Sequence, residues 1–294
     1  MKKFLYHISI LVLSGIIMLF ILDKLYTYLY TNGTPRNKVS HIFSIKNKEI
    51  DYIFIGSSRV DNHIDPKIIE KLTGETALNL GIQGAKLNDS YLLLQLLNEQ
   101  EVKTETIFIQ VDYNYNINGN SKFLTTALMP HLKNKLVSEL VKERHPDFFY
   151  LKNIPFYRYM IYDYKIGFRE VFNAAINNEP TIDLNSGYYP LTGHREDNFN
   201  ASLPSTILDE NQIIKKIDSF AKRNNMNIQY FTAPFCANTK NIDYTNKLQD
   251  KIPGLMDFSR LFSDKDEFFF NCAHLNDKGA KEFSRTFAQS IKSD

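Results

Sequence analysis

Asp51-Tyr-Ile-Phe-Ile-Gly-Ser-Ser-Arg-Val60 is the stretch that decides the fold of this chain. Within it, an apolar run from Tyr52 to Ile55 stops at Gly56 and is followed by two hydroxyls, Ser57 and Ser58. A short apolar run closed by glycine predicts a buried strand that ends in a tight turn. Ligands of open α/β sheets bind just beyond the carboxyl ends of the strands, so we expect Ser58 at a ligand-binding edge.

The flanking sequence alternates between strand and helix patterns. The further strands are expected at residues 76–81, 107–111, 228–232 and 255–258, and the helices at 65–72, 87–100, 210–224 and 277–291. Alternation of this kind predicts βαβ units and a parallel sheet. The fold class we predict is a three-layer α/β/α sandwich with a flavodoxin-like parallel sheet.

The alternation fails between residues 117 and 205, where prolines interrupt the pattern and aromatic residues crowd 148–150 and 156–164. We predict an inserted, mostly helical cap over this range. Its aromatic side chains have two interpretations: they form the core of the insertion, or they line a wall of the substrate groove.

The N-terminus contains a candidate membrane helix. Residues 4–22 are apolar apart from a few polar side chains, and about 19 residues at ~1.5 Å each nearly cross a ~30 Å hydrocarbon core. Lys2 and Lys3 precede this segment, which predicts a cytoplasmic N-terminus and an extracytoplasmic C-terminal domain. A cleaved signal peptide is the alternative, but no small-x-small site follows Leu22. We therefore predict a signal anchor and linker at 1–35, and one domain at 36–294 that contains the insertion.

Charge and cysteine content narrow the partners and the compartment. The chain has 35 Lys and Arg against 33 Asp and Glu, so its charge predicts no nucleic-acid partner. Its two cysteines are Cys236 and Cys272. In an oxidising compartment they pair, whereas in the cytosol they are small buried apolar residues.

Four loops are expected at the carboxyl edge of the sheet, and together they supply the groups that acyl transfer requires. A serine hydroxyl such as Ser58 attacks an ester only when a base removes its proton, and His274 is a base by residue type. The backbone N–H groups of Ser58 and Gly84 and the side-chain amide of Asn114 are suited to hold an oxyanion.

On these residues the chain resembles the SGNH hydrolase superfamily of GDSL-like esterases and acyltransferases. The matching blocks are Gly56-Ser-Ser58, Asn79-Leu-Gly-Ile-Gln-Gly84, Asp112-Tyr-Asn-Tyr115 and Asn271-Cys-Ala-His274. The resemblance implies a nucleophile at Ser58, a base at His274 and an oxyanion site at Ser58, Gly84 and Asn114. With the preceding membrane helix it is most similar to the branch of teichoic-acid D-alanylation and alginate O-acetylation proteins.

Two positions depart from the family pattern. Asp112 replaces a glycine of the family pattern. Asn271 replaces the aspartate that orients the catalytic histidine and stabilises the imidazolium as it forms. An amide can orient an imidazole without adding charge, so Asn271 is our candidate for the third catalytic residue. Asp266 and Asp277 are nearby in sequence and are alternatives for that role.

The remaining polar residues of these motifs have structural alternatives. Ser57 is expected to be a turn hydroxyl bonded to backbone. Arg59 either binds an acidic group of the substrate or pairs with an acid in the core. Four histidines are expected on the surface or in loops: His63, His131, His145 and His194.

The sequence thus predicts a membrane-anchored extracytoplasmic serine esterase or O-acyltransferase that acts on a cell-envelope glycan, with acetyl as the expected acyl group. The expected partners are the bilayer at residues 4–22, the glycan or acyl donor, and a membrane acyltransferase. We expect no metal and no cofactor, since no cluster has ligand spacing. The rival hypothesis is an inactive protein of this fold that binds a glycan or an envelope assembly partner.

Overall fold

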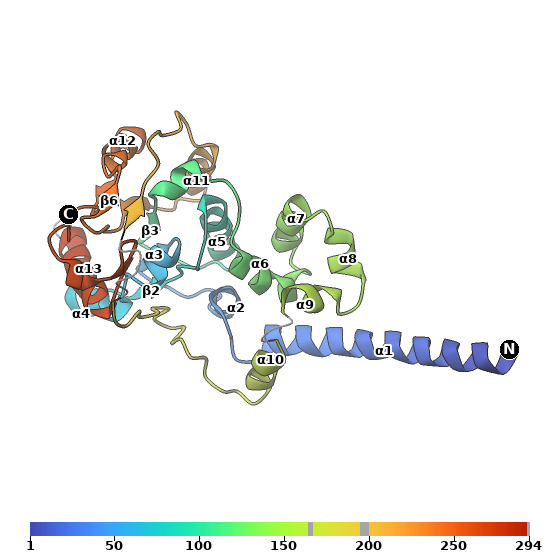
Figure 1. The fold of residues 1–294 in the computed structure, drawn as a ribbon. Coiled ribbons are helices and arrows are strands. Elements are labelled where there is room, and N and C mark those ends of the chain that lie inside the picture. Colours follow the sequence, from blue (N-terminus) through green and yellow to red (C-terminus); the bar gives the residue numbers. More distant parts are fainter. Residues whose placement is uncertain (164–166, 195–199, 293–294) are drawn as a thin grey trace. The chain divides into compact units, whose positions relative to one another are not determined.

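The structure is a computed structural model that describes residues 1–163, 167–194 and 200–292 (Figure 1). The chain divides into two compact units. Unit 1 consists of Met1–Ser44 and Thr125–Thr181, and unit 2 of Ile45–Leu124 and Ile182–Asp294. The sequence predicts an insertion at 117–205, and within this range residues 125–181 form one compact unit with the N-terminal helix.

Unit 2 is built on a five-stranded sheet in the order β2-β1-β3-β5-β7. All neighbouring strands of this sheet are parallel. The strands are β1 (Tyr52–Ile55), β2 (Ala77–Asn79), β3 (Thr106–Gln110), β5 (Ile228–Thr232) and β7 (Met256–Asp257). Counted along the chain this is the order 2-1-3-4-5 of flavodoxin-like sheets, which confirms the predicted fold class.

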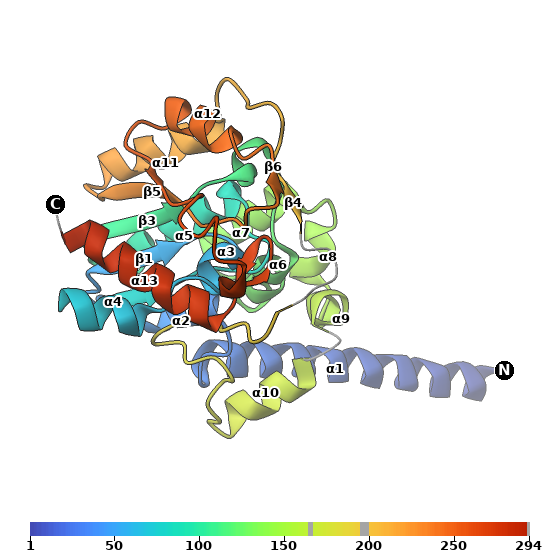
Figure 2. The same ribbon diagram turned by 60° about the vertical axis from the view of Figure 1, so that its left-hand side comes forward.

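Helices cover both faces of this sheet (Figure 2). On one face α4 (Pro66–Thr73) packs against α13 (Asp277–Lys292). Phe287 of α13 contacts the rings of Phe54, Phe108 and Phe231 from three adjacent strands. On the other face α5 (Leu87–Glu99) packs against α11 (Gln212–Arg223). Successive strand residues point to opposite faces, so the apolar runs are buried on both sides.

Local signals set several boundaries as predicted. Asp65 caps α4 by accepting the N–H of Lys67 at 3.1 Å, and the helix ends at Gly74 with a φ of 88°. Gly56 directly follows β1, and a Cβ there would lie 2.7 Å from the Cβ of Gln110. Only glycine therefore fits at the turn that leads to Ser58.

The other elements of unit 2 are short. They are α3 (Ser58–Asp61), α12 (Tyr244–Lys251), β4 (Ala201–Ser202), β6 (Thr239–Lys240), β8 (Phe269–Asn271), β9 (His274–Leu275), η1 (Tyr113–Asn116) and η3 (Asp266–Phe268). Strands β8 and β9 form an antiparallel hairpin. Helix α6 (Lys122–Leu128) runs across the division between the units.

Unit 1 contains α1 (Lys2–Asn32), the one helix of the described residues that is long and apolar enough to cross a membrane. Its remaining helices are α2 (Lys38–Ser44), η2 (Met129–His131), α7 (Lys135–Arg144), α8 (Phe148–Asn153), α9 (Tyr157–Tyr162) and α10 (Gly167–Ala175). Helix α1 is exposed through its apolar part, and its last turns pack on η2 and α10. Tyr26 and Tyr30 there pack on Tyr159 of α9, so they belong to the core of unit 1.

Candidate active site

The Ser58 hydroxyl lies at the carboxyl end of β1, at the first residue of α3. Its Oγ is 2.7 Å from Nε2 of His274, a hydrogen-bond distance between two residues 216 positions apart. Ser57 caps the helix instead: its Oγ accepts the N–H of Arg59 and donates to Oε1 of Gln110. The predicted turn role of Ser57 is confirmed.

His274 begins β9, and its other ring nitrogen bonds to the side chain of Asn271. The His274 Nδ1 to Asn271 Oδ1 distance is 3.0 Å. The same Oδ1 also accepts the backbone N–H of Ala273 at 3.0 Å. Because a backbone N–H can only donate, this second bond requires the oxygen of the amide, not its nitrogen, at that position.

This orientation of Asn271 fixes the tautomer of His274. The amide oxygen accepts from Nδ1–H, which leaves Nε2 unprotonated and facing the Ser58 hydroxyl. Burial, with the positive charge of Arg59 as the second cause, lowers the pKa of His274 to about 4. The imidazole is therefore neutral at pH 7 and ready to accept a proton.

The predicted substrate-binding role of Arg59 is wrong. Its side chain has 0% exposure, and its Nε donates to Oδ2 of Asp112 at 2.6 Å. Asp112 is equally buried and also accepts from Nε2 of Gln110. The alternative, that Arg59 pairs with an acid in the core, is confirmed, and it accounts for the aspartate at position 112.

Arg59 also connects the serine turn to the histidine loop. Its guanidinium donates to the carbonyl oxygens of Ala273, Ala233 and Pro234, and it lies 3.6 Å from the ring centre of Phe235. One buried cation thus fixes the residue next to His274 relative to the residue next to Ser58. Sequence reasoning missed this network, because a lone arginine does not reveal its partners.

His63 is a second residue that sequence reasoning missed. It lies in the turn between α3 and α4, within the predicted surface or loop positions, but its side chain has 0% exposure and its Nε2 accepts the N–H of Leu275 at 3.0 Å. Its ring stands at 88° to the ring of His274, with centres 6.0 Å apart. Burial lowers the pKa of His63 well below its usual value. Its neutral ring therefore helps to hold the backbone of the histidine loop.

A disulfide between Cys236 and Cys272 joins the loop after β5 to the loop that carries His274, with the two Cα atoms 4.8 Å apart. The N–H of Cys236 also donates to the carbonyl oxygen of Cys272 at 3.2 Å. The paired alternative of the sequence analysis therefore holds in this structure.

The expected oxyanion groups lie on loops that adjoin the serine turn. The N–H of Ser58 has no acceptor among the described residues. The Gly84 loop runs beside it, because Ile82 donates to the carbonyl oxygen of Gly56 at 2.9 Å. Asn114 is buried in its own turn, where Oδ1 accepts the N–H of Asp112 and Nδ2 makes a long, 3.4 Å contact with the Gln110 carbonyl oxygen. That Gly84 and Asn114 bind an oxyanion stays a prediction.

A cavity of about 420 Å³ opens beside His274. Asp61, Asn62 and Gln83 line it with polar groups, and Gln83 donates to the side chains of both other residues. Its remaining walls come from Asn271, His274 and four apolar or aromatic residues, Ile182, Tyr189, Leu191 and Phe270. Ser58 is only 8% exposed and does not line this cavity, whereas His274 and Asn271 do.

Neither Asp266 nor Asp277, the alternatives to Asn271 in orienting His274, is bonded to the ring of His274. Asp277 is bound to Lys281 at 2.6 Å and accepts from the Tyr188 hydroxyl at 3.2 Å. Asp266 lies in η3, and the residue bonded to Nδ1 of His274 is Asn271.

The acidic group formed by Asp51, Glu75 and Glu105 precedes the first three strands of the sheet and is therefore at the edge opposite Ser58.

Fold and site together define a class: a doubly wound parallel sheet with a Ser–His–Asn hydrogen-bond chain at its carboxyl edge. No protein-family model and no curated protein matches the chain. A solved structure assigned to the G-D-S-L lipolytic family, from Desulfitobacterium hafniense, is 11% identical with a TM-score of 0.30, and the match covers 83% of this chain and 98% of that structure's chain. A second structure, from Streptococcus pneumoniae and described by the name platelet activating factor, is 12% identical with a TM-score of 0.31. The match covers 97% of this chain and 99% of that structure's chain.

Proposed function

We propose that this chain is a serine esterase or O-acyltransferase of the SGNH type, anchored in the membrane by α1. The observation that carries the proposal is the hydrogen-bond chain from Ser58 Oγ to His274 Nε2, at 2.7 Å, and from His274 Nδ1 to Asn271 Oδ1, at 3.0 Å. Nucleophile, base and orienting group stand in the order that acyl transfer requires.

The reaction begins with attack of Ser58 Oγ on an ester carbonyl while its proton passes to Nε2 of His274. The negative charge on the carbonyl oxygen is held by the N–H of Ser58, with Gly84 and Asn114 as further donors. Collapse breaks the ester bond, and His274 returns the proton to the departing alkoxide. The product is an acyl-Ser58.

The second half repeats these steps with a new hydroxyl. Water or a sugar hydroxyl gives its proton to His274 and attacks the acyl carbonyl, which releases Ser58. Water yields hydrolysis and a sugar hydroxyl yields transfer. Because Asn271 contributes an amide dipole and no charge, the imidazolium formed in both halves is less stabilised than in a Ser–His–Asp site.

The cavity supports a saccharide as the substrate class. Its polar groups, Asp61, Asn62 and Gln83, offer both donors and acceptors, and Tyr189 offers an aromatic ring in its lining. Sugar hydroxyls need that mixture, and sugar rings stack on aromatic faces. We infer a cell-envelope glycan as the acyl donor or acceptor, with acetyl as the group carried.

The location follows from α1 and the cysteines. A lysine pair before the apolar segment favours a cytoplasmic N-terminus, and a disulfide between Cys236 and Cys272 is typical of an oxidising compartment. Unit 2 is then extracytoplasmic. A membrane acyltransferase that delivers the acyl group across the bilayer is the protein partner we propose.

One observation favours a second function, binding without catalysis. His274 has no carboxylate partner among the described residues, and Ser58 is nearly buried. A protein of this kind would use the same cavity to hold a glycan or an envelope assembly partner.

Turnover of a small ester separates the two functions. Full-length chain in detergent is expected to hydrolyse p-nitrophenyl acetate, and Ser58→Ala is expected to remove that activity. Ser57→Ala is the matched control, because it removes the neighbouring hydroxyl and keeps the nucleophile. Equal rates for the parent and Ser58→Ala would favour the binding function.

A further inference from the structure

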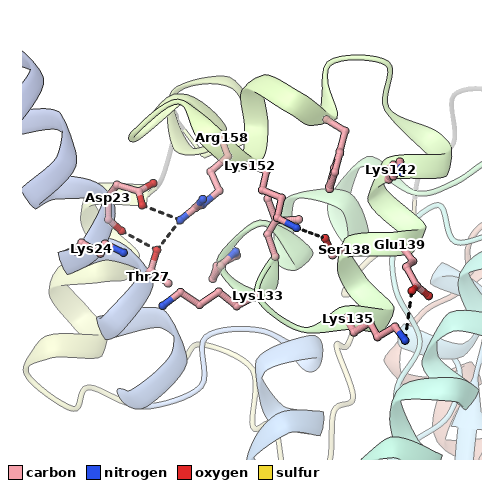
Figure 3. A pocket seen from close by; sticks show the side chains of 13 residues that line it. Asp23, Lys24, Thr27, Lys133, Lys135, Ser138, Glu139, Lys142, Lys152 and Arg158 are labelled. Carbon is pink, nitrogen blue, oxygen red and sulfur yellow. Dashed lines mark hydrogen bonds and ion pairs between the residues drawn. The ribbon is translucent and has the colours of Figure 1, made fainter.

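A second cavity, in unit 1, has more basic side chains in its lining than acidic ones. It has a volume of about 670 Å³ and lies between the last turns of α1 and helices α7 to α9 (Figure 3). Six basic side chains line it: Lys24, Lys133, Lys135, Lys142, Lys152 and Arg158. The two carboxylates of its lining are Asp23 and Glu139.

The carboxylates leave most of this charge uncompensated. Asp23 pairs with Arg158 at 2.9 Å, and Glu139 makes only a long, exposed contact of 3.9 Å with Lys135. Among the described residues, Lys24, Lys133, Lys142 and Lys152 have no carboxylate partner. A cavity with four uncompensated ammonium groups attracts an anion.

Arg158 adds a donor that is built into the wall. The residue is 8% exposed, and its Nη2 donates to Asp23 and to Thr27 Oγ1, at 2.9 and 2.8 Å. Its buried Nε has no hydrogen-bond partner. An unsatisfied buried N–H is costly, so binding is favoured for an anion with an oxygen that reaches this Nε.

The depth of the cavity matches the headgroup layer of a membrane. The apolar part of α1 ends at Leu22, and the α1 residues of the cavity, Asp23, Lys24 and Thr27, follow within two turns. At ~1.5 Å per residue, Lys24 and Thr27 lie roughly 3–8 Å beyond the hydrocarbon, where a headgroup layer of about 5–8 Å is found.

Helix α8 carries the kind of side chains that lie in this layer. Phe149 and Tyr150 are large and exposed, and Lys152 of the same helix reaches the cavity. Aromatic side chains beside lysines are typical of a surface that rests in the membrane interface. Figure 3 shows Lys133 and Arg158 extending toward α1 across the same space.

We propose that this cationic cavity of unit 1 binds the phosphate headgroup of an anionic phospholipid in the outer leaflet. The inference rests on the proposed insertion of α1 in the membrane and is independent of the chemistry at Ser58. The bound lipid holds unit 1 against the bilayer, with its phosphate oxygens on Lys133, Lys142 and the Nε of Arg158.

The test uses the full chain in mixed micelles of equal phosphatidylglycerol and phosphatidylcholine, with retained lipids counted by native mass spectrometry. We expect phosphatidylglycerol to be retained in excess, and Lys133→Gln/Lys142→Gln to reduce its retention by about tenfold or more. Lys216→Gln/Lys222→Gln on α11 removes the same charge from exposed positions of unit 2 and is expected to leave retention unchanged. These lysines are exposed, so the variants are expected to fold.

Three outcomes would overturn the proposal: no excess of phosphatidylglycerol, an equal loss in the control variant, or displacement of the lipid by millimolar inorganic phosphate or glycerol phosphate. The last would assign the site to a free phosphate. Flotation of the full chain with pure phosphatidylcholine vesicles tests separately whether α1 inserts into a bilayer. A failure of insertion is thereby distinguished from a failure of headgroup binding.

Discussion

Asn271 turns its side-chain oxygen, not its nitrogen, toward Nδ1 of His274, and the N–H of Ala273 holds the amide in that orientation. In Ser–His–Asp enzymes an asparagine in place of the aspartate costs about 10⁴ in kcat, largely because it selects the wrong tautomer. Here the geometry selects the correct one. What Asn271 lacks is the negative charge that would stabilise the imidazolium of His274.

Asn271→Asp is expected to raise the pKa of His274 from about 4, because a carboxylate stabilises the imidazolium. The imidazolium also forms during the reaction, so we expect kcat at pH 7 to rise by about 10- to 100-fold. The pH–rate profile of p-nitrophenyl acetate hydrolysis measures both effects: the acid limb of the parent lies near pH 4 and moves upward in the variant. An unmoved limb would show that His274 is not the titrating base.

Arg59→Met is expected to destabilise unit 2 by about 3–5 kcal/mol, because it leaves the carboxylate of Asp112 buried without its cation. The thermal midpoint of the full chain is expected to fall by roughly 10 °C. The double variant Arg59→Met/Asp112→Asn removes both charges and is the matched control. It should regain part of the loss; a double variant less stable than Arg59→Met would contradict the pairing.

Stability is expected to fall as the pH drops from 6.5 toward 4. Burial lowers the pKa of His274 and of His131 to about 4, and that of His63 below its usual value. The unfolded chain, with histidine pKa values near 6.5, then binds more protons than the folded chain in this window, which favours unfolding. His63→Gln is expected to reduce the acid-induced drop in the thermal midpoint. A parent midpoint that does not change between pH 7 and 4.5 would count against these buried neutral histidines.

Reduction of Cys236–Cys272 is expected to destabilise unit 2 by about 2–4 kcal/mol, because the bond closes a loop between residues 36 positions apart. It should also lower esterase activity, since the loop that carries His274 loses one of its attachments. The mass of the non-reduced full chain checks the bond, which removes about 2 Da. Two free thiols in protein taken from its native membrane would refute the pairing and weaken the extracytoplasmic assignment.

The fold was predictable because its signals are local. The apolar run before Gly56, the Asp65 cap with Pro66 and the apolar stripe of the last helix each specify one element, and βαβ alternation specifies a parallel sheet. The approach of Ser58 to His274 followed from the same rule, because both were placed at the carboxyl edge of the sheet. The apolar run at 267–270 has no such local signal, and it forms part of η3 and the start of the β8–β9 hairpin.

The support of the site was not predictable, because it depends on partners far apart in sequence. Arg59 finds Asp112 53 positions away, and His63 finds the N–H of Leu275 212 positions away. A single sequence gives the charge of Arg59 but not its burial, and charge alone left both a substrate contact and a core ion pair open. The orientation of the Asn271 amide depends on one backbone N–H, which no composition or spacing reveals.

The most direct test of the account is labelling of the full chain in detergent with a small fluorophosphonate, followed by peptide mass analysis. The reagent reports an activated serine without requiring the substrate. The account predicts an adduct on Ser58 that is absent in Ser58→Ala, is lost in His274→Ala, and forms faster in Asn271→Asp. An unlabelled Ser58 in both the parent and Asn271→Asp would contradict it and would assign the cavity to binding alone.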